Sequence, residues 1–154
     1  MEEYLIANSA VFPLILKKDN DKCNILLHRR QNTGYHDGKW DIAGGGRVDK
    51  NETPQNALTR ECNEELGIHV KLEDISFAHL SHRLISRIDK IYFDVYFIVN
   101  KYTGVPNINE PDKCSELKWF DIDNLPNDLI EQRKVAIRAW QNEKYYSEVI
   151  DYFH

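Results

Sequence analysis

The amino-acid sequence predicts an α/β protein. Apolar segments of strand length alternate along the chain with two segments of helical periodicity, a pattern typical of this fold class. Glycine, proline and asparagine mark the turns between these segments. The chain has 154 residues, no internal repeat and no low-complexity linker, a length that suits one domain with a substantial core. We therefore expect a single domain over residues 1–154.

The first quarter of the chain reads as two strands followed by a loop and a short strand. The expected strands cover residues 4–16, 23–30 and 40–43. Asp19 to Asp21 forms the first turn, and residues 31–39 form the loop. Pro13 lies inside the first strand, and a residue without an N–H group predicts an edge or a bulge there.

A helix is expected from Pro54 to about Leu66. Thr53 is a typical N-cap, and proline is favoured at the first helical position. Gly67 supplies the left-handed residue that ends many helices. Leu58, Cys62 and Leu66 recur at a spacing of four residues, which predicts that they face the core.

The second half of the chain predicts further strands and a final helix. Strands are expected over residues 70–72, 75–84, 91–99 and 117–120, with a turn-rich loop over 101–114. Asn127 or Asp128 should cap a helix that continues to about Glu143.

Three glutamates, Glu61, Glu64 and Glu65, lie within five positions of the first helix. Residues three and four apart are neighbours on a helix, and like charges so close destabilise it. A hard divalent cation, which prefers oxygen ligands, is the natural counterion. The glycine run at residues 44–46 lets backbone groups approach a ligand closely. Together these features indicate chemistry on a phosphate ester.

The same segment resembles the Nudix box, the pattern G-x5-E-x7-R-E-U-x-E-E-x-G-U, in which U is a bulky aliphatic residue. Eight positions fall in register: Gly46, Glu52, Arg60, Glu61, Glu64, Glu65, Gly67 and Ile68. Cys62 departs from the pattern at the first aliphatic position, where a free cysteine still behaves as a small hydrophobe. Ala43 stands where many members have proline. The resemblance extends from the first strand to the last helix.

The resemblance implies a Nudix α/β/α sandwich, with a mixed β-sheet between helices. It also implies roles for named residues. Glu61, Glu64 and Glu65 would be catalytic and would hold metal ions together with the backbone carbonyl of Gly45. A further ligand would come from a late loop, with a weak preference for Glu116 over Glu110. A plain surface carboxylate is an equal alternative for Glu116. Gly46, Glu52, Arg60 and Gly67 would be structural, with Arg60 paired to Glu52.

The activity implied by the resemblance is Mg2+-dependent pyrophosphohydrolysis, with Mn2+ as a possible substitute. The substrate would be a nucleoside diphosphate linked to another group, first of all a nucleoside triphosphate, including oxidised ones, that gives the monophosphate and pyrophosphate. Hydrolysis of ADP-ribose or nucleotide sugars is an alternative, as is a module that senses a nucleotide without cleaving it. An isopentenyl diphosphate isomerase is disfavoured because its cysteine and glutamate arrangement is absent.

Substrate contacts outside the box are expected from Arg30, Tyr35 and Trp40. Arginine suits bidentate contacts with phosphate, and the two aromatic rings could stack on a base. For each aromatic residue the alternative is a place in the core. Arg29, His82 and Arg83 are further candidates for phosphate contacts, although charged residues at strand ends are commonly just solvated.

Composition narrows the range of partners. The formal net charge is −5, which lacks the basic footprint of a nucleic-acid-binding protein. No apolar run reaches the length of a membrane span, and the acidic start at Met1 to Glu3 lacks the basic region of a signal peptide. The three cysteines have no C-x-x-C spacing and indicate reduced thiols. A cytoplasmic enzyme with a small-molecule substrate is therefore expected, in an oligomeric state that the sequence leaves open.

Overall fold

Strand β1, Asn8–Asp19, runs through the centre of the sheet and is paired along both edges. One edge is parallel to β6, Lys90–Val99, in a register that joins Asn8 to Tyr92 and Ile15 to Val99. The other edge is antiparallel to two strands in turn, first the short β4, Gly46–Arg47, and then β2, Lys22–Arg30. Because β1 has both kinds of partner, the sheet is mixed, as the sequence predicts.

The remaining strands extend this sheet on both sides. The strand order is β3-β2-β1-β6-β5-β8, with β4 paired to β1 and β7 paired to β2. The bounds are Trp40–Ile42 for β3, Ile75–Ile85 for β5, Cys114–Asp121 for β7 and Tyr146–Asp151 for β8. The computed structural model describes residues 3–152, so Met1 and Glu2, part of the acidic start, lie outside the described residues.

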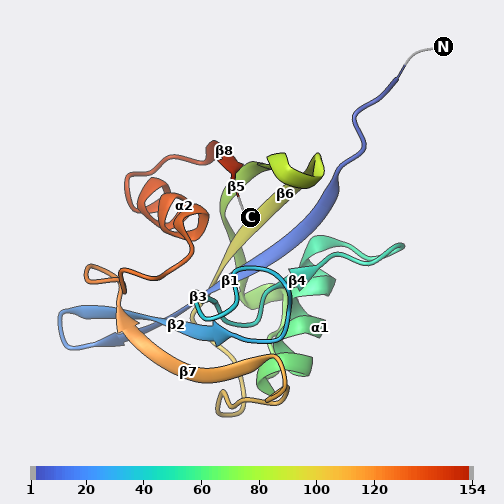
Figure 1. Cartoon of the computed structure of the whole chain (residues 1–154). Coiled ribbons are helices and arrows are strands. Elements are labelled where there is room, and N and C mark those ends of the chain that lie inside the picture. The colour runs from blue at the N-terminus through green and yellow to red at the C-terminus, as the bar shows by residue number, and fades with distance from the viewer. Residues whose placement is uncertain (1–2, 153–154) are drawn as a thin grey trace.

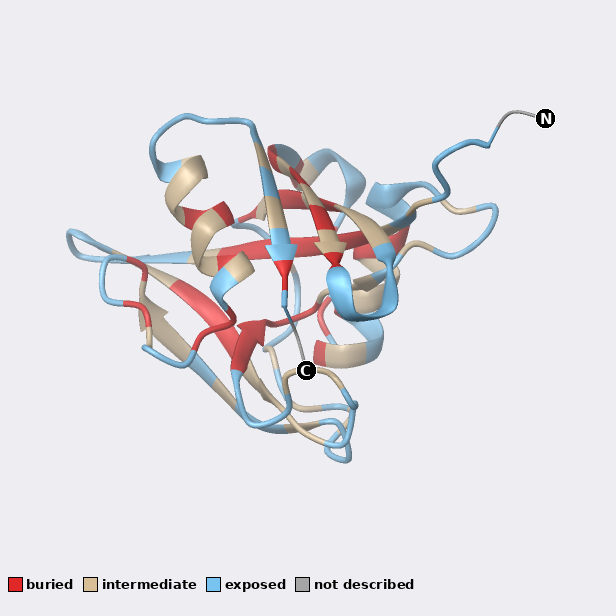
Figure 2. Ribbon diagram, turned by 45° about the horizontal axis from the view of Figure 1, so that its top comes forward, coloured by how far each residue is buried: buried red, intermediate tan, exposed pale blue. Residues whose placement is uncertain are grey.

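Two helices cover opposite faces of the sheet, α1 at Pro54–Leu66 and α2 at Glu131–Gln141 (Figure 1). Side chains alternate between the faces of a strand, and β1 follows this rule. Phe12 belongs to one core cluster with Ile137 of α2, whereas Val11 belongs to a second cluster with Leu58 of α1. Figure 2 shows the buried residues concentrated in the central strands between the helices. The α/β/α sandwich is therefore confirmed.

Several element boundaries differ from the prediction. Strand β1 begins at Asn8 rather than at residue 4, and its pairing with β6 begins at the same residue, which lies opposite Tyr92. Pro13 lies inside β1, neither at a sheet edge nor at a bulge. It falls between Val11, the last residue paired to β4, and Leu16, the first paired to β2. The missing N–H group therefore coincides with a gap in pairing on that edge.

Other differences affect the second half of the chain. Residues 70–72 form no strand, and a short 3-10 turn covers Leu72–Asp74 instead. Helix α2 begins at Glu131 after Ile130, which makes no side-chain capping bond, so neither Asn127 nor Asp128 caps it. The short strand β4 and the C-terminal strand β8 were not predicted, and β8 pairs in parallel with β5. Over residues 3–152, neither helix has the length and apolarity needed to cross a bilayer.

Candidate functional site

Helix α1 begins and ends as its sequence predicts. The Thr53 hydroxyl accepts a hydrogen bond from the backbone N–H of Asn56 at 3.3 Å. Gly67 has φ 69° and donates its N–H to the carbonyl of Asn63, which closes the last turn. Leu58 and Cys62 are fully buried against the sheet. Fixing this face of the helix directs the neighbouring face, which carries the glutamates, towards the loop at Gly44–Gly46.

Arg60 is the centre of an ion-pair network at the start of this glutamate face. It donates to both carboxylate oxygens of Glu52, at 2.7 and 2.8 Å, so the expected pair forms. It also contacts Glu61 at 2.8 Å and Glu64 at 3.2 Å. The hydrogen bonds from Arg60 lower the pKa of Glu52 to about 2. Arg60 therefore joins the loop after the glycines to two of the three glutamates.

The glycine loop lies so close to its surroundings that side chains have no room. A Cβ atom on Gly46 would lie 2.3 Å from the carboxyl carbon of Glu61. A Cβ atom on Gly45 would lie 2.6 Å from the ring of Phe12. Gly46 therefore lets the Glu61 carboxylate lie directly on the loop backbone, which explains why glycine is needed at these two positions.

A cavity of about 580 Å³ lies between the glycine loop and α1. Gly45 and all three helix glutamates line it, so the structure brings the predicted carboxylates together with the loop. Glu65 is the most distinctive of them. One of its carboxylate oxygens, Oε2, is buried and has no hydrogen-bond partner within the described residues. Burial and the nearby Glu61 raise its pKa well above the ordinary value, and burial also raises the pKa of Glu61.

The donor set of this cavity fits a hard divalent cation. An orphaned buried carboxylate oxygen is costly unless a ligand compensates it, and carboxylate and carbonyl oxygens are the ligands that Mg2+ prefers. The arrangement is not a closed metal cluster, however. Between residues 3 and 152 no three His, Cys, Asp or Glu side chains are grouped closely enough to hold a metal ion. Glu61 and Glu64 are ion-paired with Arg60 instead.

The structure corrects the weak preference for Glu116 as a further ligand. Glu116 lies on β7, where it forms an ion pair with Arg29 at 2.5 Å, and it does not line the cavity. Glu110 does line the cavity, and its charge contributes to the raised pKa of Glu65. The pairing of β7 with β2, which joins Glu116 to Arg29 in register, is the physical reason.

The three residues expected to contact the substrate have different outcomes. Trp40 is only 5% exposed and packs edge-on against Phe120 in the core, so the expected stacking on a base is wrong for this residue. Arg30 lines the cavity, and it also lines a second, adjoining cavity of about 240 Å³. Tyr35 lines only the second cavity. Arg30 and Tyr35 therefore lie in cavity walls, where a substrate could reach them, and their contact with a substrate stays a prediction.

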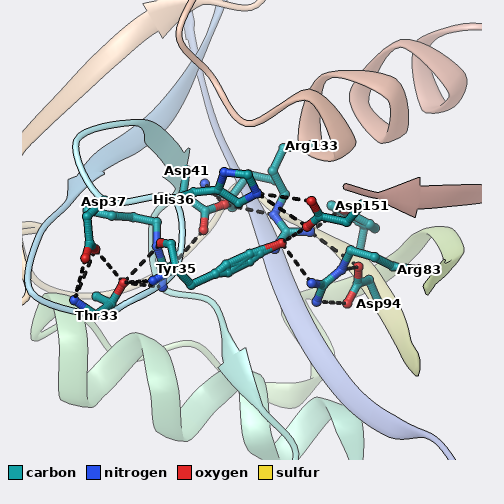
Figure 3. Close-up of polar contacts among 12 residues, drawn as sticks. Thr33, Tyr35, His36, Asp37, Asp41, Arg83, Asp94, Arg133 and Asp151 are labelled. Carbon is teal, nitrogen blue, oxygen red and sulfur yellow. Dashed lines mark hydrogen bonds and ion pairs between the residues drawn. The ribbon is translucent and has the colours of Figure 1, made fainter. Parts of the chain in front are cut away.

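A network of polar and charged residues surrounds the second cavity and was not predicted (Figure 3). Five of its members line the cavity, whereas Asp94 and Asp151 do not and are hydrogen-bonded to residues that do. The members come from β2 and the loop after it, from β3, β5, β6 and β8, and from α2. They are Arg30, Tyr35, Asp41, Arg83, Asp94, Arg133 and Asp151. The one signal in the sequence was an isolated charge, Asp94, inside the apolar strand of residues 91–99, because buried charges require partners.

Comparisons with known proteins agree with this geometry. Residues 8–141 match the family described as NUDIX domain. A stretch of 66 residues is 42% identical to "Nucleoside triphosphatase NudI" of Salmonella arizonae, a match that covers 43% of this chain and 44% of that protein. The chain therefore aligns with less than half the length of the curated relatives it matches.

Solved structures show the same fold. A MutT NUDIX hydrolase from Burkholderia pseudomallei has a TM-score of 0.77 at 25% identity, over 87% of this chain and 98% of that chain. The NUDIX domain of Shewanella oneidensis NrtR, solved with ADP ribose, has a TM-score of 0.70 at 16% identity, over 91% and 90%. The family match covers most of the chain and contains α1, the glycine loop and the carboxylate cavity. The protein belongs to the NUDIX domain family.

Proposed function

We propose that this protein is a divalent-metal-dependent hydrolase of phosphoric anhydrides whose first substrate class is the nucleoside triphosphates. The single observation that carries the proposal is the carboxylate cavity, in which a buried, unpartnered oxygen of Glu65 lies beside Glu61 and the glycine loop. The name of the Salmonella relative, a nucleoside triphosphatase, supports the substrate class.

Glu61, Glu64 and Glu65 would hold Mg2+, joined by the backbone carbonyl of Gly45 and by Glu110. When bound, the ion neutralises phosphate charge and lowers the pKa of a coordinated water. Mn2+ would serve in its place because it accepts the same oxygen ligands.

The chain's own residues contribute position and charge. Burial and the nearby Glu61 raise the pKa of Glu65, and a cation beside its carboxylate would favour the ionised form. Arg60 keeps Glu61 and Glu64 at the mouth of the same cavity and ties both to the loop through Glu52. Gly45 and Gly46 line the cavity, and Gly46 lets the Glu61 carboxylate lie against the loop backbone. These features favour cleavage of a phosphoanhydride bond. We place it between the α and β phosphates of a nucleoside triphosphate, where the addition of water yields the monophosphate and pyrophosphate.

Two alternatives use the same cavity. ADP-ribose or a nucleotide sugar also carries a diphosphate, and the NUDIX domain of NrtR, which resembles this chain in fold, was solved with ADP ribose. A sensing module would bind a nucleotide and leave it intact. The full set of box glutamates disfavours the sensing module, because binding alone needs no buried, unpartnered carboxylate.

A product assay across substrates tests the proposal. The protein is incubated with common and oxidised deoxynucleoside triphosphates, ADP-ribose and nucleotide sugars, each with Mg2+ and with excess chelator. We expect monophosphate and pyrophosphate from at least one triphosphate, only when Mg2+ is present. Turnover of ADP-ribose alone would make ADP-ribose the substrate in place of the nucleoside triphosphates. Tight binding without turnover of any compound would support the sensing module.

A further inference from the structure

The second cavity shares part of its wall with the carboxylate cavity. Arg30, Gly45, Gly46 and Glu65 line both. A ligand whose phosphates lie at the glutamates can therefore extend into the second cavity without leaving the protein. The volume of about 240 Å³ and the aromatic residues Phe12 and Tyr92 in its wall suit a flat ring system.

The polar groups around the second cavity form a closed ring of hydrogen bonds (Figure 3). Arg83 donates to the Tyr35 hydroxyl at 3.0 Å and to Asp94 at 2.7 and 3.0 Å. Arg133 donates to Asp94 at 3.3 Å and to Asp41 at 2.8 Å. Arg30 donates to Asp41 at 3.0 Å and to the Tyr35 carbonyl at 2.7 Å, which closes the ring.

Every carboxylate oxygen of Asp41 and Asp94 in the ring has a hydrogen-bond partner, but one donor atom of Arg133 remains available. Both oxygens of Asp41 accept hydrogen bonds, from Arg30, Arg133 and the Ile42 backbone, and both oxygens of Asp94 accept from arginines. Arg133 uses its Nε and Nη1 atoms for these bonds and for the Tyr96 hydroxyl. Its Nη2 atom makes no hydrogen bond to any residue from 3 to 152, although Arg133 is 3% exposed and lines the cavity.

A guanidinium nitrogen with free N–H groups on a residue that lines a cavity selects a hydrogen-bond acceptor. Guanine and thymine present carbonyl oxygens at the edge where adenine presents an amino donor. An amino group placed against Arg133 would leave two donors facing each other, and the neighbouring carboxylates of the ring, Asp41 and Asp94, already have partners. The chemistry of the second cavity therefore favours a base with a carbonyl oxygen over adenine.

We propose that Arg133 is a specificity-determining residue, which donates a hydrogen bond from Nη2 to a carbonyl oxygen of the substrate's base in the second cavity. This inference rests on the proposed function only for the presence of a nucleotide in the site. It concerns recognition of the base and not cleavage of the phosphates.

Asp151 acts as a positioning residue for the ring around the second cavity. It lies in β8, is 1% exposed, and accepts the hydrogen bond of the Tyr35 hydroxyl (Figure 3). Its Oδ1 atom also lies 3.3 Å from Nε2 of His36. Through Tyr35, Asp151 holds the loop of residues 31–39 and one side of the charged ring against the C-terminal strand.

Equilibrium binding of uncleavable analogues tests the inference without hydrolysis. The probes are α,β-methylene deoxynucleoside triphosphates of guanine, thymine and adenine, with inorganic tripolyphosphate as the probe that lacks a base. We expect the wild-type protein to bind the guanine or the thymine analogue at least tenfold more tightly than the adenine analogue. Equal affinity for all three bases, or preference for adenine, would overturn the inference even if hydrolysis occurs.

Variants locate the source of this preference. Arg133→Lys keeps the positive charge but removes Nη2, so the preference should fall below threefold while the affinity for tripolyphosphate changes less than twofold. An equal loss for every probe would contradict the assignment. If this variant fails to fold, Asp151→Asn and Asp151→Ala replace it. Asparagine keeps an acceptor for Tyr35 and should retain the preference, whereas alanine should weaken it, and identical behaviour of the two would contradict the positioning role.

Absence of hydrolysis by the wild-type protein would refute the proposed function and leave this inference standing, provided that the preference among bases is measured. Hydrolysis without any preference among the bases would support the proposed function and refute the role of Arg133. The two claims can therefore fail independently.

Discussion

The two cavities of this protein share a wall but are built in different ways. In the carboxylate cavity, the three helix glutamates and the glycine loop come from one continuous segment, from Gly44 to Gly67, although residues such as Arg30 and Glu110 complete the lining. The second cavity depends on residues far apart in the chain, such as Asp41 and Arg133, which are 92 positions apart. The glutamates of the carboxylate cavity belong to a local sequence motif, whereas the second cavity forms only once the whole sheet and α2 have assembled.

This difference in construction predicts a difference in behaviour. A change in the carboxylate cavity should affect chemistry more than stability, because its Glu65 carboxylate has a buried oxygen without a hydrogen-bond partner. A change in the charged ring should affect stability first, because its ions are buried and mutually paired. Four substitutions test this contrast.

The largest expected effect is on turnover by Glu65→Gln. Loss of the buried carboxylate should lower kcat/KM at least a thousandfold, which corresponds to about 4 kcal/mol in the activation free energy. Thermal stability of the metal-free variant should equal or exceed that of the wild type, since an uncompensated buried charge is removed. Steady-state kinetics and melting curves check both, with the exposed Glu73→Gln as the control. Retention of most activity would separate Glu65 from the chemistry.

The next largest effect is on folding, by Asp94→Ala in the charged ring. Asp94 is fully buried and accepts hydrogen bonds from Arg83 and Arg133. Its removal leaves two buried guanidinium groups with one partner fewer, which costs about 3–5 kcal/mol of the free energy of unfolding. Urea denaturation checks this value, with the exposed Asp112→Ala as the control. A loss below 1 kcal/mol would mean that the ring does not hold the second cavity together.

A smaller effect concerns the pH dependence of stability through Asp41. Burial raises its pKa, but Arg133 and Arg30 outweigh that effect and lower the pKa to about 2. The folded pKa is thus below the unfolded value of about 4, so ionised Asp41 contributes about 2–3 kcal/mol above that pH. This contribution is lost as the pH falls from about 4 towards 2.

Unfolding by urea at pH 7 and at pH 3 measures this dependence. The wild-type protein should lose more stability between the two values than Asp41→Asn, which has no carboxylate to protonate. Parallel losses in the two proteins would show that the acid sensitivity comes from other groups.

The smallest of the four effects is expected for Arg60→Ala. The Arg60 side chain is 27% exposed, so solvent weakens its ion pairs relative to those of the charged ring. We expect a loss of about 2 kcal/mol in the free energy of unfolding. The variant also releases Glu61 and Glu64, so its affinity for Mg2+ should rise or stay constant. Calorimetric titration with Mg2+ and urea denaturation measure the two quantities, and unchanged stability with abolished turnover would instead place Arg60 in the chemistry.

The same contrast explains how much the sequence could predict. The helix from Pro54 to Leu66 and its caps follow from residues at short, fixed spacing, and the Arg60–Glu52 pair follows from the family resemblance. All are present. The choice between Glu110 and Glu116 could not be made, because it depends on the register of β7 against β2. The partners of Arg83 and Arg133 were equally hidden, since β6 and α2 must first reach their places in the sandwich.

Strand β8 illustrates the physical limit most clearly. Its residues alternate only weakly between apolar and polar, and its pairing partner β5 lies more than sixty positions earlier in the chain. No local pattern therefore indicates that Asp151 will be buried beside Tyr35. Trp40 shows the converse error, because an aromatic residue next to a functional loop can equally well belong to the core.

Hydrolysis in oxygen-18 water tests the central claim most directly. A deoxynucleoside triphosphate found to be a substrate is incubated with the protein and Mg2+, and the products are separated and weighed by mass spectrometry. We expect monophosphate and pyrophosphate in equal amounts, with a single labelled oxygen in one of the two. No products should form when a chelator replaces Mg2+. Direct release of orthophosphate from the triphosphate, or undiminished cleavage in chelator, would contradict it.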